Sequence, residues 1–122
     1  MAEIIKTHYI TGELKEIYFV NSGKREGEYK RYYTNGQLYE IVNYIDGEME
    51  GEYKSYHANG QQWDVCNFIN GIIDGECKEY YSNGQLQETY NYINGKLEGI
   101  HKKYYKNGQL SSTVNFKNNI EE

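Results

Sequence analysis

The amino-acid sequence predicts an all-β fold: an elongated, single-layer antiparallel β-meander, a repeat rod of about ten strands with two strands in each repeat. Three observations predict this fold. A segment of 24 residues recurs along the chain, every copy carries turn-forming dipeptides, and aromatic and β-branched residues dominate between the turns. Helices are not expected, because the turn dipeptides interrupt each segment before a helix could nucleate.

The repeat organises the chain as a single domain over residues 1–122. Residues 27–50 read GEYKRYYTNGQLYEIVNYIDGEME, and similar units follow at 51–74, 75–98 and 99–122. Residues 3–26 form a fifth, degenerate copy, in which Thr11-Gly12 stands where the others have Asn-Gly. The last unit lacks its second turn glycine. Degenerate end units are typical of the caps of repeat arrays.

Two turn signals divide each unit into two strands. The first is Asn-Gly, at Asn35-Gly36, Asn59-Gly60, Asn83-Gly84 and Asn107-Gly108. Asn-Gly is typical of a two-residue type I′ hairpin turn, so we expect that turn here. The second signal follows at Asp46-Gly47, Asn70-Gly71, Asn94-Gly95 and, degraded, Asn118-Asn119. We expect this connection to be looser, because Gly51, Gly75 and Gly99 would allow a bulge or a close backbone approach where the next strand begins.

A two-residue Asn-Gly turn fixes which residues face each other across the hairpin. The pairs that it predicts away from the turn are Ile5/Tyr18, Tyr29/Val42, Tyr53/Cys66, Cys77/Tyr90 and His101/Val114. Each of these pairs joins one ring with one smaller side chain. Beside the turn, the same register predicts Tyr33/Leu38, His57/Gln62, Tyr81/Leu86 and Tyr105/Leu110.

The register sorts the side chains onto two faces of the sheet. One face, called the ring face here, carries the pairs above with Tyr44, Phe68, Tyr92 and Phe116, and we expect it to be the better buried. The other, called the Tyr/Lys face, carries a Lys, a Tyr and an Asn from each full unit. These are Lys30, Lys54, Lys78 and Lys102; Tyr32, Tyr56, Tyr80 and Tyr104; and Asn43, Asn67, Asn91 and Asn115.

Composition and charge exclude several classes of function. The formal net charge of −5 argues against nucleic-acid binding, which needs a dense Lys/Arg surface, and against binding to anionic membranes. No apolar run is long enough to span a membrane, and no leader segment is visible. The cysteines, Cys66 and Cys77, are too few for a disulfide framework, so we expect reduced thiols and a cytoplasmic location.

The motif G-E-Y-K-x-Y-Y-x-N-G-Q-L, followed by Tyr or Phe and a second turn glycine, resembles the MORN repeat, in particular its shorter bacterial and viral variant. The resemblance covers residues 3–122. It implies a rod of successive hairpins that acts as an interaction or scaffold module. Lipid contact is proposed for some members of the family, and toxin neutralisation for some bacterial arrays. No appended catalytic domain is visible, so an enzymatic role gained by fusion is not expected.

No residue cluster predicts chemistry. His8, His57 and His101 occupy three different repeat positions, so they are interpreted as rings that replace Tyr rather than as metal ligands. Cys66 and Cys77 are interpreted as small packing residues rather than a redox pair. Cys66 with His57 would lack the third, orienting group of a nucleophilic site. We therefore predict no catalytic, cofactor or metal site, and no enzyme.

Acidic residues flank the repeat glycines and should line one edge of the rod. They are Glu26, Glu28, Glu50, Glu52, Asp74, Glu76 and Glu98. A solvated edge and a docking strip for a basic partner both remain open; calcium is not expected, because no liganding loop motif is present. Trp63 breaks the repeat, and the register places it opposite Tyr56, as a packing plug or as a binding hot spot.

We expect a module that binds another protein through the Tyr/Lys face. The predicted partner-binding residues are Tyr32, Tyr56, Tyr80, Tyr104, Lys30, Lys54, Lys78, Lys102 and Trp63. The alternatives are an antitoxin-like partner that occludes a toxin and a peripheral phospholipid-binding module. Uncovered strands at both termini, with Ile4-Ile5 near one of them, also predict homo-oligomers through edge pairing.

Overall fold

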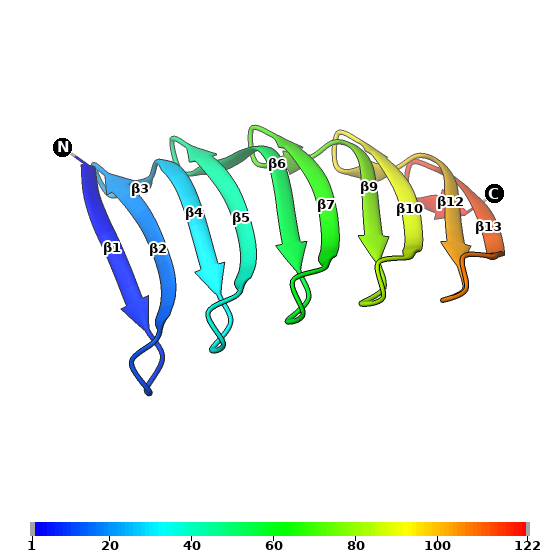
Figure 1. Cartoon of the computed structure of the whole chain (residues 1–122). Helices are drawn as coiled ribbons and strands as arrows, with labels where there is room; N and C mark the ends of the chain where they lie inside the picture. Colours follow the sequence, from blue (N-terminus) through cyan, green and yellow to red (C-terminus); the bar gives the residue numbers. More distant parts are fainter. Residues whose placement is uncertain (1, 122) are drawn as a thin grey trace.

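The computed structural model describes residues 2–121, which form one open antiparallel sheet (Figure 1). Ten longer strands make up the hairpins: β1 (Ala2–His8), β2 (Leu14–Asn21), β4 (Gly27–Tyr32), β5 (Leu38–Ile45), β6 (Glu48–Tyr56), β7 (Gln62–Ile69), β9 (Gly75–Tyr80), β10 (Leu86–Ile93), β12 (Gly99–Tyr104) and β13 (Leu110–Lys117). They pair in chain order from β1 to β13. The predicted all-β meander is confirmed.

Four two-residue strands raise the number of strands in residues 2–121 to 14. They are β3 (Lys24–Arg25), β8 (Ile72–Ile73), β11 (Lys96–Leu97) and β14 (Ile120–Glu121). β3 and β4 are separated at Glu26, and Gly27, the first residue of β4, has a φ of 94°. β6 passes the equivalent Gly51 unbroken, but its pairing with β5 shifts there. The predicted bulges at the repeat glycines are therefore present.

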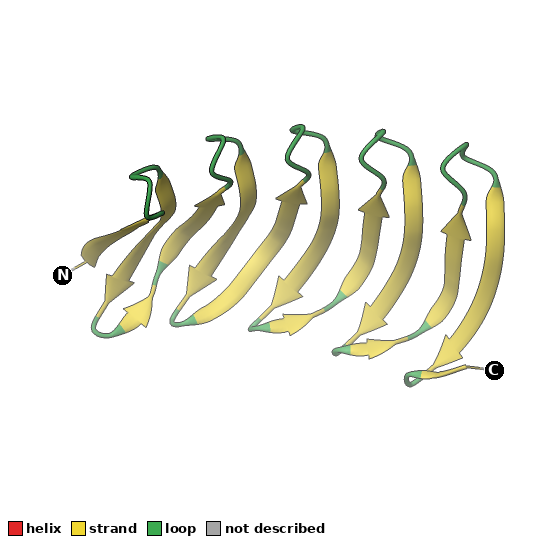
Figure 2. Ribbon diagram, turned by 90° about the horizontal axis from the view of Figure 1, so that it is seen from below, coloured by secondary structure: helices red, strands yellow, loops and turns green. Residues whose placement is uncertain are grey.

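The hairpins lie side by side with one open edge at each end of the array (Figures 1 and 2). The Asn-Gly loops project along one margin of the sheet, and the short strands lie along the other. No second layer covers residues 2–121, so few residues are buried: Tyr29, Val42, Cys77 and Ser55, of which Cys77 is fully buried. Within this range no helix has the length and apolar character needed to cross a membrane.

The two turn types are the reverse of those expected. The backbone N–H of Tyr33 donates to Gln37 and that of Gly36 donates to Tyr33, and in the loop of residues 34–36 only Gly36 has a positive φ, 86°. This is a three-residue loop, a type I turn followed by a left-handed glycine, because Asn35 keeps a negative φ and its side-chain oxygen instead accepts from the N–H of Gln37.

The two-residue type I′ turn lies at the second connection. Asp46 and Gly47 have φ values of 53° and 86°, and Ile45 pairs directly with Glu48. The terminal copy keeps the same turn without glycine, since Asn118 and Asn119 have φ values of 51° and 70°. Asn tolerates the left-handed region better than most residues, so this turn is not degraded in structure.

The predicted register is correct along most of each hairpin. The pairs Ile5/Tyr18, Tyr29/Val42, Tyr53/Cys66, Cys77/Tyr90 and His101/Val114 all lie opposite each other. Beside the loop the prediction is wrong, because Leu38 pairs with Tyr32 instead of Tyr33. The three-residue loop adds one residue to the connection, and a bulge that leaves Tyr39 unpaired restores the register.

Candidate functional site

On the Tyr/Lys face, each of three lysines is paired with a glutamate two residues earlier on the same strand. The Nζ to carboxylate distances are 3.1 Å for Lys30–Glu28, 3.1 Å for Lys54–Glu52 and 3.6 Å for Lys78–Glu76. The bond to Glu28 raises the pKa of Lys30. This face therefore presents paired charges of both signs, not a basic stripe.

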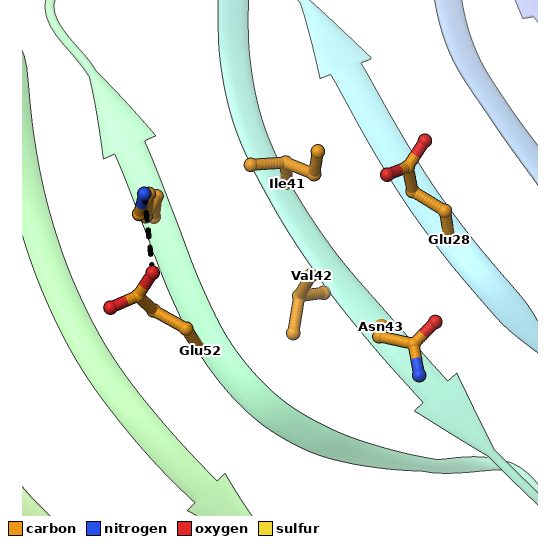
Figure 3. Close-up of a pocket in the computed structure, with 6 residues that line it drawn as sticks. Glu28, Ile41, Val42, Asn43 and Glu52 are labelled. Atoms are coloured by element: carbon orange, nitrogen blue, oxygen red, sulfur yellow. Dashed lines mark ion pairs between the residues drawn. The ribbon is translucent and has the colours of Figure 1, made fainter.

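Shallow hollows recur along this face. The first, of about 210 Å³, lies between β4 and β6 and is lined by Glu28, Ile41, Val42, Asn43, Glu52 and Lys54 (Figure 3). A second, of about 360 Å³, includes Glu52, Lys54, Glu76, Lys78 and Tyr80, one repeat further on. A third, of about 440 Å³, is lined by residues of β12 and β13, with Lys102 among them. Hollows thus recur along this face, and the first two share the ion pair of Glu52 with Lys54.

The predicted tyrosines Tyr32, Tyr56, Tyr80 and Tyr104 are half-buried at the strand ends beside the Asn-Gly loops. Their backbone carbonyls join neighbouring repeats, because each accepts a hydrogen bond from a side chain 23 residues earlier. The donors are the hydroxyls of Tyr9, Tyr33 and Tyr81, at 2.6 Å, and Nε2 of His57, at 2.8 Å. The interpretation of His57 as a ring in place of Tyr is therefore confirmed, with the proton on Nε2.

Trp63 occupies the bulge position of its unit and stacks on His57, with ring centroids 4.6 Å apart and an interplanar angle of 15°. The equivalent ring, Tyr39, packs against Tyr33 with centroids 4.7 Å apart, but tilted by 41°. The predicted neighbour, Tyr56, is wrong, because the bulge displaces this position from the expected pairing. Trp63 thus lies with His57 rather than beside the tyrosines of the Tyr/Lys face, and its role in binding stays a prediction.

The ring face carries a ladder of aromatic contacts across the strands. Centroid distances are 5.6 Å for Tyr18–Tyr29, 6.2 Å for Tyr29–Tyr44, 6.3 Å for Tyr53–Phe68, 5.2 Å for Tyr90–His101 and 5.9 Å for His101–Phe116. The ladder is interrupted between Tyr53 and Tyr90, where the two facing side chains are Cys66 and Cys77. Small side chains at this point leave a hollow.

Cys66 on β7 and Cys77 on β9 are joined by a disulfide, with their Cα atoms 4.4 Å apart. The expectations of reduced thiols and of simple packing residues are therefore wrong. The pairing register explains the bond, because Asp64 lies opposite Glu79 and the two cysteines are the next facing pair on the same side of the sheet. Cys77 is fully buried.

A row of charged side chains runs beside the aromatic ladder on the ring face. At its N-terminal end the charges alternate, since Arg31 lies opposite Glu16 on β2 and Glu40 on β5. The pKa of Glu16 is lowered, first by the hydroxyl of Tyr29, which donates to it at 2.6 Å, and further by the attraction of Arg31. Further along, the row becomes acidic.

In the acidic part, Glu79 lies opposite Asp64 on one side and Glu88 on the other. Burial, followed by repulsion from the neighbouring carboxylates, raises the pKa of Glu79. Burial likewise raises the pKa of Asp64, although Ser55 donates to its carboxylate at 3.2 Å. Sequence reasoning missed this row, although the predicted register already placed Glu79 opposite Glu88.

The acidic corner residues have partners within the fold. Carboxylates of Glu26, Glu50, Asp74 and Glu98 accept hydrogen bonds from backbone N–H groups of the next tight turn, at 2.5 to 3.0 Å. The remaining corner glutamates form the ion pairs with lysine described above. These contacts stabilise the stacking of repeats, so the corners act as turn caps rather than as a free strip for a basic partner.

The other histidines do not form a metal site. His101 takes the place of a ring on the ladder, and its Nε2 lies 3.0 Å from Glu88. Within residues 2–121, no group of three or more His, Cys, Asp or Glu side chains is placed to hold a metal ion. The sheet thus presents two chemically different faces.

The fold and the repeated surface contacts define a β-hairpin repeat protein of the interaction-module class. The sequence profile of the MORN repeat variant matches residues 25–46, 49–70, 73–94 and 97–118, and the chain belongs to this family. MORN repeats are in general protein and lipid interaction modules. The matched units begin at the corner strands, so residues 3–26 are recognised as a repeat only by their hairpin, β1 and β2.

Other comparisons add little. A search of curated proteins found no match. Among solved structures, the chain is similar to one titled "Crystal structure of accessory secretory protein 1,2 and 3 in Streptococcus pneumoniae", with a TM-score of 0.43 and 13% sequence identity. The match covers 78% of this chain and 18% of that one.

Proposed function

We propose that the protein is a non-enzymatic module that binds an extended segment of a partner protein along its Tyr/Lys face. The observation that carries this proposal is the recurrence of hollows with glutamate and lysine between successive hairpins of this face, one of which is drawn in Figure 3. An extended segment lying across the strands would meet the ion pair of Glu52 with Lys54 and then that of Glu76 with Lys78. Repeat arrays commonly use such extended surfaces for binding.

The chemistry of the face suits a peptide better than a lipid surface. The first two hollows each offer carboxylates and an ammonium group to backbone or side-chain polar groups, and the tyrosines of this face offer an apolar body with a hydroxyl. The paired charges and the net charge of −5 oppose attraction to anionic phospholipids. Enzymatic activity is not proposed, since the polar residues of this face recur in every unit instead of converging once.

Affinity purification from native cells, followed by mass spectrometry, tests the proposal. We expect a partner that is captured by the natural chain and lost with Tyr32, Tyr56 and Tyr80 all changed to Ser. Two single Lys→Ser changes serve as controls. Lys78→Ser alters the Tyr/Lys face and should weaken capture of the partner, whereas Lys103→Ser alters the ring face and should leave capture unchanged. Capture that survives the triple change, in protein shown by circular dichroism to be folded, contradicts the proposal.

The same experiment distinguishes a scaffold from an inhibitor. If the captured protein is an enzyme or toxin whose activity falls in proportion to the added chain, the antitoxin-like alternative is supported. Liposome co-sedimentation that decreases with salt would support lipid binding instead.

A cytoplasmic location is also a proposal. The disulfide counts against it, because such bonds persist mainly in oxidising compartments. Alkylation of Cys66 and Cys77 in quenched cell extracts tests the location.

A further inference from the structure

The interruption of the aromatic ladder on the ring face opens a pocket of about 460 Å³. Three carboxylates, of Glu40, Asp64 and Glu79, and three rings, of Tyr53, Phe68 and Tyr90, line it. The pocket exists because Cys77 stands where the other full units supply a ring, Tyr29, Tyr53 or His101, and the residue that faces it, Cys66, is also small. It lies on the opposite face from the hollows of the proposed function and does not depend on that function.

The pocket holds more negative charge than its own residues balance. Glu40 accepts a hydrogen bond from Tyr53 at 2.5 Å, and Asp64 accepts one from Ser55. Glu79 has no hydrogen-bond or ion-pair partner within residues 2–121, although it faces carboxylates on both sides. Like charges directly opposite each other destabilise a sheet. A cation bound in the pocket would offset the repulsion between these carboxylates.

The first repeats show which cation fits this environment, because there the chain supplies it. The guanidinium of Arg25 lies over three rings, 4.4 Å from the centroid of Tyr18, 5.0 Å from Tyr29 and 5.5 Å from Tyr44. Arg31 lies between carboxylates on the two neighbouring strands. Both arginines are on the ring face; one repeat later the position of Arg25 lines the pocket, and the position of Arg31 contacts Asp64 of its lining.

The later repeats have lost both arginines. Twenty-four residues after Arg25 stands Met49, which lines the pocket, and 24 residues after Arg31 stands Ser55. In the following unit the second position is Glu79, so a carboxylate has replaced the guanidinium. Two of the three rings around Arg25 recur one repeat later as Tyr53 and Phe68, whereas Val42 takes the place of Tyr18. Carboxylates recur at Glu40 and Asp64, and the cation of the first repeats is missing.

We propose that this pocket binds an arginine side chain of a partner protein. A guanidinium can donate to several carboxylate oxygens at once and stack on aromatic rings, whereas an ammonium group acts as a compact point charge. The acidic row gives the attraction, and Tyr53, Phe68 and Tyr90 provide faces for stacking. The disulfide fixes β7 and β9 beneath the bound side chain.

The probe for the test is the peptide acetyl-Gly-Gly-Arg-Gly-Gly-amide, titrated into ¹⁵N-labelled protein and followed by NMR. Peptides with citrulline or lysine in place of arginine serve as ligand controls. We expect saturable shifts at the amides of β7, β9 and β10, no saturation with citrulline, and at least several-fold weaker binding of lysine. Equal binding of the citrulline or lysine peptide overturns the proposal.

Matched variants place the binding on the ring face. The double change Asp64→Asn and Glu79→Gln should weaken arginine-peptide binding about tenfold or more, which corresponds to the loss of one charge-assisted contact. Glu76→Gln removes a carboxylate from the same strand, but on the Tyr/Lys face, and should leave the affinity within about twofold of the natural value. Equal losses in the two cases would assign the binding to net charge and overturn the proposal.

A further variant places an arginine of the chain itself in the pocket. Met49→Arg restores the residue that stands one repeat earlier, and we expect it to abolish peptide binding and to raise the midpoint of thermal unfolding. Met49→Leu, which keeps an apolar side chain, should bind the peptide as the natural protein does. If Met49→Arg folds and still binds the peptide with unchanged affinity, the analogy between the two sites fails, and with it the proposal.

Discussion

Reduction of the disulfide between Cys66 and Cys77 should measurably destabilise the array. The bond closes a loop with a sequence separation of 11, and a chain-entropy treatment of a loop this short predicts a loss of about 3 kcal/mol on its removal. For a chain of this size, that loss lowers the midpoint of thermal unfolding by about 10 °C. The effect should be largest at the junction of β7 and β9, since each repeat contacts only its neighbours.

Urea unfolding followed by tyrosine fluorescence, with and without dithiothreitol, measures the difference. Hydrogen exchange then shows whether protection is lost mainly in the repeats that the bond connects. The double change Cys66→Ser and Cys77→Ser is the control, because its unfolding should match that of the reduced protein and should not respond to dithiothreitol. Complete reduction requires partial unfolding, as Cys77 is fully buried.

Two results would refute this reasoning. Thiols that react with an alkylating agent before any reductant is added would show that the cross-link does not form. An unchanged urea midpoint in a protein that mass spectrometry shows to be fully reduced would show that the bond contributes no stability. In that case, packing of the ring face alone would hold β7 against β9.

The remaining predictions concern inter-repeat contacts, charge and assembly. Tyr81→Phe removes a hydrogen bond to the carbonyl of the next repeat and should cost about 1 kcal/mol in urea unfolding. Glu79→Gln should raise stability at pH 7 by up to about 1 kcal/mol, because Glu79 faces the carboxylates of Asp64 and Glu88, and burial together with their repulsion raises its pKa. Since its pKa is raised in the fold, the penalty is present above that pKa and disappears below the unfolded value of about 4.3; urea midpoints that differ equally at pH 3.5 and pH 7 would contradict it. Finally, unpaired edges at β1 and β13 should give a light-scattering mass that rises with concentration, whereas a constant monomer mass would count against edge pairing.

The pairing register of the hairpins was predicted in part from the sequence. The pair Tyr29/Val42 was predicted correctly from a wrong turn type. The three-residue loop shifts the strands by one position, and the bulge at Tyr39 shifts them back, so the two differences cancel beyond the bulge. Between loop and bulge they do not cancel, and there the predicted partners of Leu38 and Trp63 were wrong.

For the candidate site, too, the sequence predicted one part and not another. Alternation of side chains was sufficient to place Lys30 and Lys54 on one face and the rings on the other, since neighbouring residues of a strand point to opposite sides. It was not sufficient to show that each lysine is paired with a glutamate on its own strand. Nor could it join Cys66 to Cys77, because these residues belong to different hairpins and the connection between them contains a bulge whose size the pattern does not specify.

The sequence by itself determined the architecture of this protein, because its short period, its turn residues and its alternation act through local contacts that every repeat reproduces. Only the tertiary structure decided what lies between hairpins: the disulfide, the hydrogen bonds from one repeat to the next, and the acidic pocket beside Glu79. These features depend on register across the corner glycines and on differences between copies. A repeat pattern describes what the copies share, whereas the candidate arginine site arises where two small side chains and a missing arginine make them differ.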